Sequence, residues 1–317
     1  MSDSAPELSV VVPFFEEEEA IARFFEEILP ILEALERSFE VIAIDDGSKD
    51  RTFERLARVH GADARVRVIR FRRNFGQAAA LAAGFAEAKA ETVVTLDGDL
   101  QNDPSEIPRL LHELDSGADV VSGWRRDRED HTLTRILPSR IANAIIRRVT
   151  GVELHDFGCG IKAYRAEITR GIRLYGELHR FLPALAADLG AEVREIPVRH
   201  RPRTLGRSKY GLSRTLRVVL DLLTVRFLSG FATRPIQFFG ALGLPAFLLG
   251  GLLLAWLGFE RIFLGVELGG RPIVLLAIFL AITGLQFLTF GLLAEMLART
   301  WHESRDKPVY VVRETLG

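Results

Sequence analysis

Short apolar runs alternate with helical patterns along the first part of the chain. The runs are LSVVV, FEVIAI, VRVI, TVVTL and ADVV, which begin at Leu8, Phe39, Val66, Thr92 and Ala118. Apolar residues between Ile21 and Leu35 recur at roughly helical spacing, and the Ala-rich stretch Ala78–Ala88 predicts a second helix. Strand–helix–strand repetition of this kind predicts an α/β fold with a mainly parallel sheet, covered by helices on both faces.

The pattern changes near residue 235, where long spans without charge begin. One span runs from Pro235 to Phe259 and another from Pro272 to Ala294. Each exceeds the roughly 20 residues that cross a bilayer at about 1.5 Å per residue. A buried core hairpin is the alternative. We expect two transmembrane helices, at about 236–259 and 272–294, joined by a short glycine-containing linker.

Basic residues flank this hairpin and predict its orientation. Three precede it and four follow it, whereas the linker holds two, Arg261 and Arg271. This modest bias favours a cytoplasmic catalytic portion and a cytoplasmic tail at 298–317. The segment 212–234, with apolar residues at helical spacing from Leu216 to Phe227, could lie along the membrane interface or form a plain core helix.

Composition narrows the class of protein further. The chain has 317 residues, with 41 Lys plus Arg against 42 Asp plus Glu, for a net charge of −1. Nothing in this balance indicates nucleic acid. A single cysteine excludes an intramolecular disulfide framework and fits a reducing compartment. The start, MSDSAPE, lacks the features of a signal peptide.

Acidic residues gather where the predicted strands end. Ligands of parallel α/β sheets bind at the carboxyl ends of the strands. Here these ends carry PFFEE from Pro13, DDGS from Asp45, RRNFG from Arg72 and DGD from Asp97. The stretch GCGIKA from Gly158 matches a dinucleotide fingerprint, but it lacks the strand–turn–helix setting that would support it.

Asp97 and Asp99 flank a glycine directly after an apolar run. Asp-Gly is a common turn, and both acids could be solvated. Alternatively, the two carboxylates hold one divalent cation, with the amide oxygen of Gln101 as a further hard ligand. The second acidic cluster, at Asp45 and Asp46, is compatible with a base or ribose contact. Ser48 or Asp50 could instead cap the helix that begins near Thr52.

Together these segments resemble family-2 glycosyltransferases. PFFEEEEAI from Pro13, DDGSKD from Asp45, RNFGQ from Arg73 and DGDLQ from Asp97 occur in the order and rough spacing of that family. The chain is most similar to its polyprenyl-phosphate branch, the dolichyl-phosphate mannosyltransferase-like enzymes, whose bacterial members carry two C-terminal membrane helices. It departs from the family at Phe15 and Glu16, where Tyr and Asn are usual. No Q-x-x-R-W follows RFLPAL at Arg180, which argues against processive synthases.

The resemblance implies a Rossmann-like GT-A domain over 1–211, juxtamembrane helices over 212–234 and a transmembrane hairpin over 235–297. It implies Mg²⁺ or Mn²⁺ held by Asp97, Asp99 and Gln101, against the diphosphate of a UDP- or GDP-linked sugar. The residues that it assigns to the nucleotide sugar are Pro13, Phe15, Glu17, Asp45, Asp46, Arg73 and Asp97.

Two basic segments complete the implied site. HRPRTLGRSKYG, from His200, could attract anionic lipid; the resemblance makes it a lid whose Arg207 and Lys209 cover the leaving diphosphate. WRRDR from Trp124 and the following RILPSRIAN could be solvated surface. The resemblance implies that Arg125, Arg135 and Ser139 receive a lipid phosphate, a role for which arginine suits phosphate oxygens. The role of Asp156 is left open between orienting the sugar and capping a turn.

We therefore expect a multi-pass enzyme of the inner membrane that transfers a sugar to polyprenyl phosphate with inversion. Asp99, Arg207 and Lys209 are its expected catalytic residues. Alternatives are a transferase that uses another lipid or glycan acceptor and a membrane-bound nucleotide-sugar sensor or scaffold without turnover. A homo-oligomer formed through the membrane helices is left open.

Overall fold

The computed structural model describes residues 5–126, 143–144, 146–148, 150–174, 178–201, 235–303 and 309–317. The chain divides into two compact units. The first contains the residues up to Val225 and those from Pro308 to Gly317, and the second spans Arg226–Lys307.

Strands and helices alternate through the first unit, as the apolar pattern predicts. Its strands are β1 (Leu8–Phe14), β2 (Phe39–Asp45), β3 (Val66–Phe71), β4 (Thr92–Thr95), β5 (Val120–Trp124), β6 (Lys162–Arg165), β7 (Val193–Pro197) and β8 (Val312–Leu316). Its helices are α1 (Ile21–Glu33), α2 (Thr52–Ala62), α3 (Gln77–Glu87), α4 (Ile107–Asp115), α6 (Ala166–Gly171) and α7 (Leu182–Asp188). Short 3₁₀ turns occupy Pro104–Glu106 and Leu178–Phe181.

Among the described residues, eight strands form one sheet in the order β7-β5-β6-β4-β1-β2-β3-β8. The four central strands, β4, β1, β2 and β3, are parallel. β6 runs antiparallel between β4 and β5, and β8 pairs antiparallel with β3 at the edge. The prediction of a mainly parallel α/β sheet is confirmed, whereas β6, β7 and β8 were not predicted.

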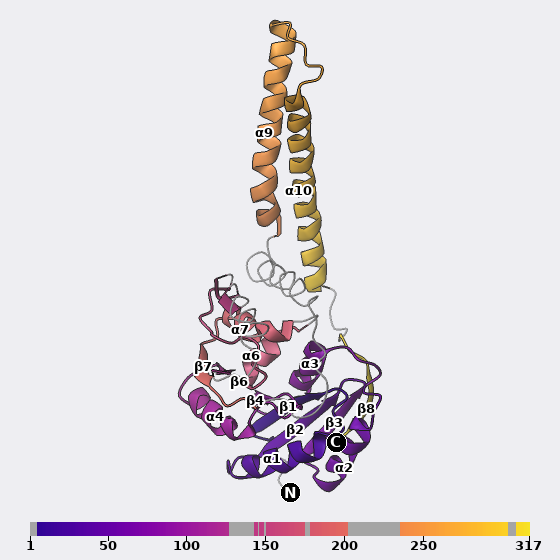
Figure 1. The fold of residues 1–317 in the computed structure, drawn as a ribbon, viewed down its shortest axis with the longest axis vertical. Helices are drawn as coiled ribbons and strands as arrows, with labels where there is room; N and C mark the ends of the chain where they lie inside the picture. Colours follow the sequence, from indigo (N-terminus) through magenta and orange to yellow (C-terminus); the bar gives the residue numbers. More distant parts are fainter. Residues whose placement is uncertain are drawn as a thin grey trace. The chain divides into compact units, whose positions relative to one another are not determined.

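Alternating side chains of the central strands divide between two apolar layers. Val10 and Val12 of β1 belong to one core with Phe24 and Ile28 of α1. Val11 points the other way and meets α3. Because β4 lies on the opposite side of β1 from β2, a right-handed crossover places α3 on the face opposite α1 and α2 (Figure 1).

Helix α3 lies unusually close to the sheet because it has a glycine at the contact. A Cβ on Gly84 would lie 2.1 Å from Cγ1 of Val11 and 3.2 Å from Cδ1 of Ile44. We expect Gly84→Ala to lower the free energy of unfolding by about 1–3 kcal/mol, the usual cost of overpacking a core. Thermal or chemical unfolding of the full chain in detergent would measure this loss.

Gly61 supplies the matched control, since it lies in α2 with nothing within 4 Å of the same added atom. Gly61→Ala should leave the stability unchanged or raise it by up to about 1 kcal/mol, because alanine favours a helix. Equal effects of the two substitutions would contradict the close approach of α3.

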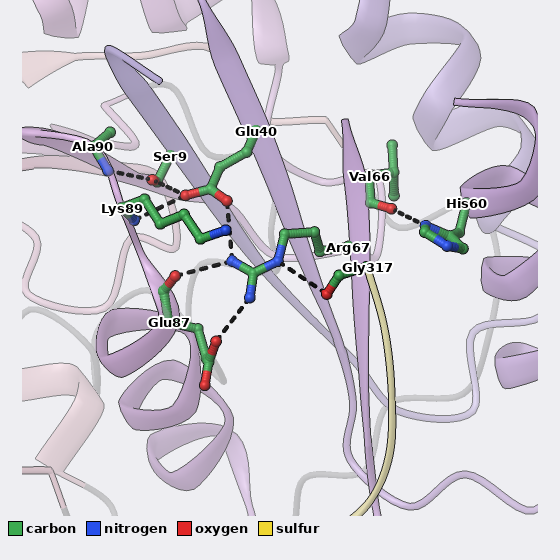
Figure 2. Close-up of polar contacts among 9 residues, drawn as sticks. All are labelled: Ser9, Glu40, His60, Val66, Arg67, Glu87, Lys89, Ala90 and Gly317. Atoms are coloured by element: carbon green, nitrogen blue, oxygen red, sulfur yellow. Dashed lines mark hydrogen bonds and ion pairs between the residues drawn. The ribbon is translucent and has the colours of Figure 1, made fainter. Parts of the chain in front are cut away.

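A network of hydrogen bonds and ion pairs lies at the amino ends of the central strands (Figure 2). Buried Glu40 of β2 accepts hydrogen bonds from the Ser9 hydroxyl at 2.7 Å and the Lys89 N–H at 2.9 Å. Its other oxygen lies 3.1 Å from Nη1 of Arg67, whose Nη2 contacts Glu87 at 2.7 Å. The opposite end of the sheet, where the sequence predicts the ligand site, carries a different set of polar groups.

The second unit is a helical hairpin of α9 (Pro235–Phe263) and α10 (Pro272–Glu303). Within these helices, Gln237–Phe263 and Pro272–Ala294 are long and apolar enough to cross a membrane, and 11% of an apolar 18-residue stretch of each is buried. Little of either span is therefore covered, unlike a core hairpin. Both helices extend a little beyond the predicted spans.

Small residues bring the two helices of the hairpin together. A Cβ on Gly250 would lie 2.4 Å from the backbone nitrogen of Ala281, and one on Gly284 would lie 2.3 Å from that of Phe247. Glycine at such contacts lets helix backbones approach within a membrane, where dispersion contacts rather than the hydrophobic effect hold helices together.

Candidate functional site

The carboxyl ends of β1, β2, β3 and β4 meet at one edge of the sheet, as predicted. The loop after β4 carries Asp97 and Asp99, both partly exposed. Gln77, the first residue of α3, donates from Nε2 to Oδ1 of Asp97 at 2.7 Å. The Gln101 N–H donates to Oδ1 of Asp99 at 3.2 Å. The two acids therefore belong to an ordered loop that is bonded to the start of α3.

Two glycines let this acidic loop pack tightly against its surroundings. A Cβ on Gly160 would lie 2.1 Å from Oδ2 of Asp97, and one on Gly98 would lie 2.3 Å from Cε1 of Phe14. The Thr95 hydroxyl donates to the Gly160 carbonyl at 3.0 Å. The segment before β6 and the end of β1 thus fix the position of Asp97 from two sides.

Asp97 is an unusually basic carboxylate in this setting. Burial and the neighbouring charge of Asp99 raise the pKa of Asp97 to about 6, against the attraction of Lys162 and Arg125. A partly desolvated acid pair of this kind favours a bound cation, because a cation relieves the repulsion between the two charges.

A cation of the protein itself lies behind the acids. Lys162 is 4% exposed and donates from Nζ to the carbonyl of Cys159. Burial lowers the pKa of Lys162. Burial also raises the pKa of the Cys159 thiol to about 11, so this thiol is protonated near neutrality and is not a nucleophile.

Asp45, the last residue of β2, and Asp46, which follows it, lie in two different environments. Asp46 accepts hydrogen bonds from the N–H groups of Phe75 at 2.7 Å and Gly76 at 2.9 Å. Asp45 is fully buried; its Oδ1 accepts the Ser48 N–H at 3.0 Å. Its Oδ2 has no hydrogen-bond partner among the described residues, although Nε of Arg70 lies 3.5 Å away. Burial raises the pKa of both carboxyls.

The segment after β1 is bound to the segment after β2. The Glu16 N–H donates to the Ser48 hydroxyl at 2.9 Å, and the Glu17 N–H donates to the Thr52 hydroxyl at 3.1 Å. Pro13 lies near the end of β1 and is in register with Ile44 of β2. Phe15 is the first residue after β1. The structure therefore brings Pro13, Phe15 and Glu17 together with the acids of β2.

Arg73 joins the same edge from the loop after β3. A Cβ on Gly47 would lie 2.2 Å from the carbonyl carbon of Arg73, and the φ of Gly47 is +69°. This close approach requires glycine on both counts. The exposed guanidinium of Arg73 lies over the ring of Phe75, 4.1 Å from its centroid.

Arg125 and Asp156 form a buried ion pair at the end of β5. β5 and β4 run in the same direction, because both pair antiparallel with β6. Arg125 donates from Nε and Nη2 to the two oxygens of Asp156, at 2.6 and 2.8 Å. Burial opposes the charge on Arg125, but the contact with Asp156 outweighs it and raises the pKa of Arg125. Asp156 also accepts the Gly158 N–H at 3.1 Å, so it both caps a turn and orients Arg125.

A basic cavity of about 270 Å³ lies at the ends of β5 and β7, and Arg126, the residue after Arg125, is part of its lining. Its lining includes Arg109, Arg126, Arg199 and His200, with Glu106 as the acidic member. Glu106 is engaged by Arg109 at 2.5 Å and by the Arg199 N–H at 3.3 Å. The cavity therefore has an excess of positive charge, which suits an anionic group.

The remaining predicted residues, Arg135, Ser139, Arg207 and Lys209, lie outside the described residues, as does the segment 212–234. Within the described part of the chain, no group of three or more His, Cys, Asp and Glu side chains could hold a metal ion. Asp97, Asp99 and Gln101 offer two carboxylates and an amide. This donor set fits an ion that takes its other ligands from phosphate and water.

Sequence reasoning missed three contributors to the site: Gln77, Gly160 and Lys162. Gln77 is the last residue of RNFGQ, one of the segments that carry the family resemblance, but no role is assigned to it there. Gly160 and Lys162 fall in GCGIKA, which was rightly rejected as a dinucleotide fingerprint, since β6 begins at Lys162 and follows the glycines. A lysine that opens the mostly buried strand KAYR was the available clue.

Comparison with known proteins agrees with this arrangement. The sequence pattern described as Glycosyl transferase family 2 matches residues 9–173. A dodecaprenyl-phosphate galacturonate synthase of Rhizobium johnstonii is 42% identical over 97% of this chain and 92% of its own. An undecaprenyl-phosphate 4-deoxy-4-formamido-L-arabinose transferase of Yersinia pestis is 34% identical over 100% of this chain and 96% of its own.

Solved structures share the fold. Glucosyl-3-phosphoglycerate synthase from Mycobacterium tuberculosis, in complex with Mn²⁺, UDP-glucose and glycerol 3-phosphate, superimposes with a TM-score of 0.52. It is 24% identical, over 70% of this chain and 80% of its own. The matched family pattern and the similar relatives agree with the strand ends and the acidic pair described above. The chain therefore belongs to glycosyltransferase family 2 and has the α/β GT-A-like fold of that family.

Proposed function

We propose that this glycosyltransferase moves a sugar from a nucleotide sugar to a polyprenyl phosphate, with inversion at the anomeric carbon. The observation that carries the proposal is the meeting of Asp97 and Asp99 with the buried acid Asp45 at one sheet edge, beside the arginines that follow β5. Relatives that span nearly the whole chain are polyprenyl-phosphate sugar transferases by name. They support the same acceptor here.

We place the nucleoside of the donor at the ends of β1, β2 and β3, where the residues assigned to it by the resemblance meet. Oδ2 of Asp45 is buried without a hydrogen-bond partner among the described residues, and a base N–H would satisfy it. Asp46 was expected to contact the nucleotide sugar as well, but its two oxygens already accept hydrogen bonds from the Phe75 and Gly76 N–H groups. Asp46 therefore holds the loop that carries Arg73. The base, UDP or GDP, is to be found by testing both.

Asp97, Asp99 and Gln101 would hold a divalent cation, Mg²⁺ or Mn²⁺. When bound, it would neutralise charge on the diphosphate and so make the nucleotide a better leaving group. The positive charges of Lys162 and Arg125 favour the ionised form of Asp97 and so oppose the rise in its pKa. Gln77 and Gly160 fix the direction of its carboxylate.

The affinity for this cation should fall in acid. The cation binds ionised Asp97, whose pKa is about 6 in the metal-free protein. Protons therefore compete for the site below pH 6. We expect the Mn²⁺ dissociation constant to be nearly constant from pH 7 to 8 and to rise about tenfold per pH unit below 6. Titration of Mn²⁺ into the metal-free protein at several pH values would measure this, and an affinity that does not change between pH 5 and 7.5 would contradict it.

The acceptor needs no protein base. A lipid monophosphate has a second pKa of about 6, by analogy with phosphoserine, so it is largely dianionic near neutrality. One of its oxygens attacks the anomeric carbon as the bond from that carbon to the diphosphate oxygen breaks. The chain contributes by holding two anionic substrates together, which requires cations on both.

Arginines at two places suit the incoming phosphate. Arg125 uses Nε and Nη2 on Asp156, so Nη1 is the part of its guanidinium that could reach a phosphate. The basic cavity with Arg109, Arg126 and Arg199 adds positive charge beside it. From the resemblance we propose that Arg135 and Ser139 join Arg125 there, while Arg207 and Lys209 close over the leaving diphosphate.

The long lipid acceptor also explains the hairpin. A polyprenyl chain stays in the bilayer, so an enzyme anchored beside the headgroups meets it in two dimensions. We propose that α9 and α10 cross the inner membrane with the catalytic unit on the cytoplasmic face, in line with the distribution of basic residues.

Incubation of the purified full chain with undecaprenyl phosphate and a panel of labelled UDP- and GDP-sugars tests the function. We expect label to enter the organic phase only when lipid phosphate, divalent cation and one donor are present. If the label enters another lipid or a glycan instead, that molecule is the acceptor and the proposal of polyprenyl phosphate is wrong. Donor binding without any transfer would indicate a sensor instead.

A further inference from the structure

The C-terminal strand β8 is attached to the loop that follows β3. Residues 309–317 come after the apolar hairpin in sequence, yet they belong to the same compact unit as the sheet. β8 pairs antiparallel with β3, from Val68 opposite Leu316 to Phe71 opposite Val312 (Figure 1). At the far end of β8, Nε of Arg67 lies 3.5 Å from the Gly317 carbonyl (Figure 2).

The contacts continue past the end of β3 into the loop. The Arg72 N–H donates to the Val311 carbonyl at 3.0 Å. Half-buried Tyr310 stacks on Phe71, with ring centroids 4.9 Å apart and planes 12° apart. Phe71 in turn packs edge-to-face on Phe75 at 5.8 Å.

This row of rings ends at Arg73. The Arg73 guanidinium lies over Phe75, and Asp46 binds the Phe75 N–H from the other side of the loop. The loop 72–76 is thus held between the acid that ends β2 and the C-terminal segment. Because Arg73 itself is exposed, packing of its neighbours is what fixes its position.

We propose that Tyr310 is a positioning residue for the nucleotide sugar: through Phe71 and Phe75 it sets the conformation of the 72–76 loop and the direction of Arg73. The inference rests on the proposed function, since it assumes that this loop contacts the donor. It assigns the segment after the second apolar helix to the donor site rather than to a passive tail.

The test compares Tyr310→Ala with Tyr310→Phe in the full chain. Binding is measured by titrating UDP, and separately GDP, with Mn²⁺ present. Amide hydrogen exchange reports on residues 72–76. Stacked aromatic pairs are worth enough to change an equilibrium about two- to tenfold. We expect Tyr310→Ala to weaken binding of the preferred nucleotide by about that factor and to speed exchange in the loop. Tyr310→Phe keeps the ring and should behave as the unmodified chain.

Arg313→Ala is the matched control, because Arg313 is exposed on the same strand and is not part of the row of stacked rings. It should change neither measurement. Equal nucleotide affinity of Tyr310→Ala and the unmodified chain overturns the inference. So does faster exchange spread evenly over β1 and β2, which would mean a purely structural role. If the unmodified chain binds neither UDP nor GDP, the proposed donor site itself fails, which is a separate outcome.

Discussion

Asp99→Ala should lower the rate of sugar transfer about a thousandfold at saturating substrate. Removing one preorganised charge-stabilising group from an active site commonly costs 10²–10³ in turnover, and loss of a metal carboxylate also weakens the ion that leaving-group departure needs. Asp99 accepts the Gln101 N–H and lies partly exposed at the rim, so its removal leaves the buried core intact. The measurement is the initial rate of label entering the organic phase, across a Mn²⁺ titration.

Asp115→Ala is the control for this variant. Asp115 is also an aspartate, but it lies at the end of α4 in an exposed pair with Arg37. It should leave the rate unchanged. Normal transfer by Asp99→Ala at low Mn²⁺ would refute the metal site at this loop and, with it, the proposed mechanism.

Asp156→Ala should lower the free energy of unfolding by about 3–5 kcal/mol. The substitution leaves the Arg125 guanidinium buried without its bidentate partner, and an unpaired buried charge is among the costliest defects in a protein. Both side chains are well covered, with 14% of Arg125 and 5% of Asp156 exposed. Chemical unfolding of the full chain in detergent would show the loss.

Two comparisons separate the buried charge from the general effect of a substitution. Asp115→Ala breaks an exposed ion pair and should cost no more than about 1 kcal/mol. The double variant Arg125→Met with Asp156→Leu removes both charges and should recover much of the lost stability. If Asp156→Ala unfolded at the same denaturant concentration as the unmodified chain, the ion pair would not bear on stability.

Parallel strands and their acidic ends were predictable because their causes are local. The runs at Leu8, Phe39, Val66 and Thr92 are mostly apolar, as expected for strands of a sheet that is covered on both faces. Asp45 and Asp97 follow such runs directly. Once the strands are parallel, these acids must meet at one edge. For this reason the sequence placed Asp45, Arg73, Asp97 and Asp99 in one site.

Contacts between distant segments could not be predicted in the same way. The Arg125–Asp156 pair joins residues 31 positions apart, and β8 joins residues near 70 and 315. Nothing local marks Asp156 as the partner of Arg125 rather than the cap of a turn; in the structure it serves both. The tail expected at 298–317 similarly contains the edge strand β8, whose residues carry no strong apolar alternation.

The sequence by itself determined the class of fold, the two apolar spans and the acids at the strand ends, because periodicity and composition act over a few residues at a time. Only the tertiary structure decided which groups contact those acids and bury them. Gly160 and Lys162 reach Asp97 because β6 runs antiparallel between β4 and β5. Tyr310 reaches the 72–76 loop through Phe71 because β8 returns to β3. Burial and close approach are properties of assembled segments, and they set the pKa of Asp97 and the position of Arg73.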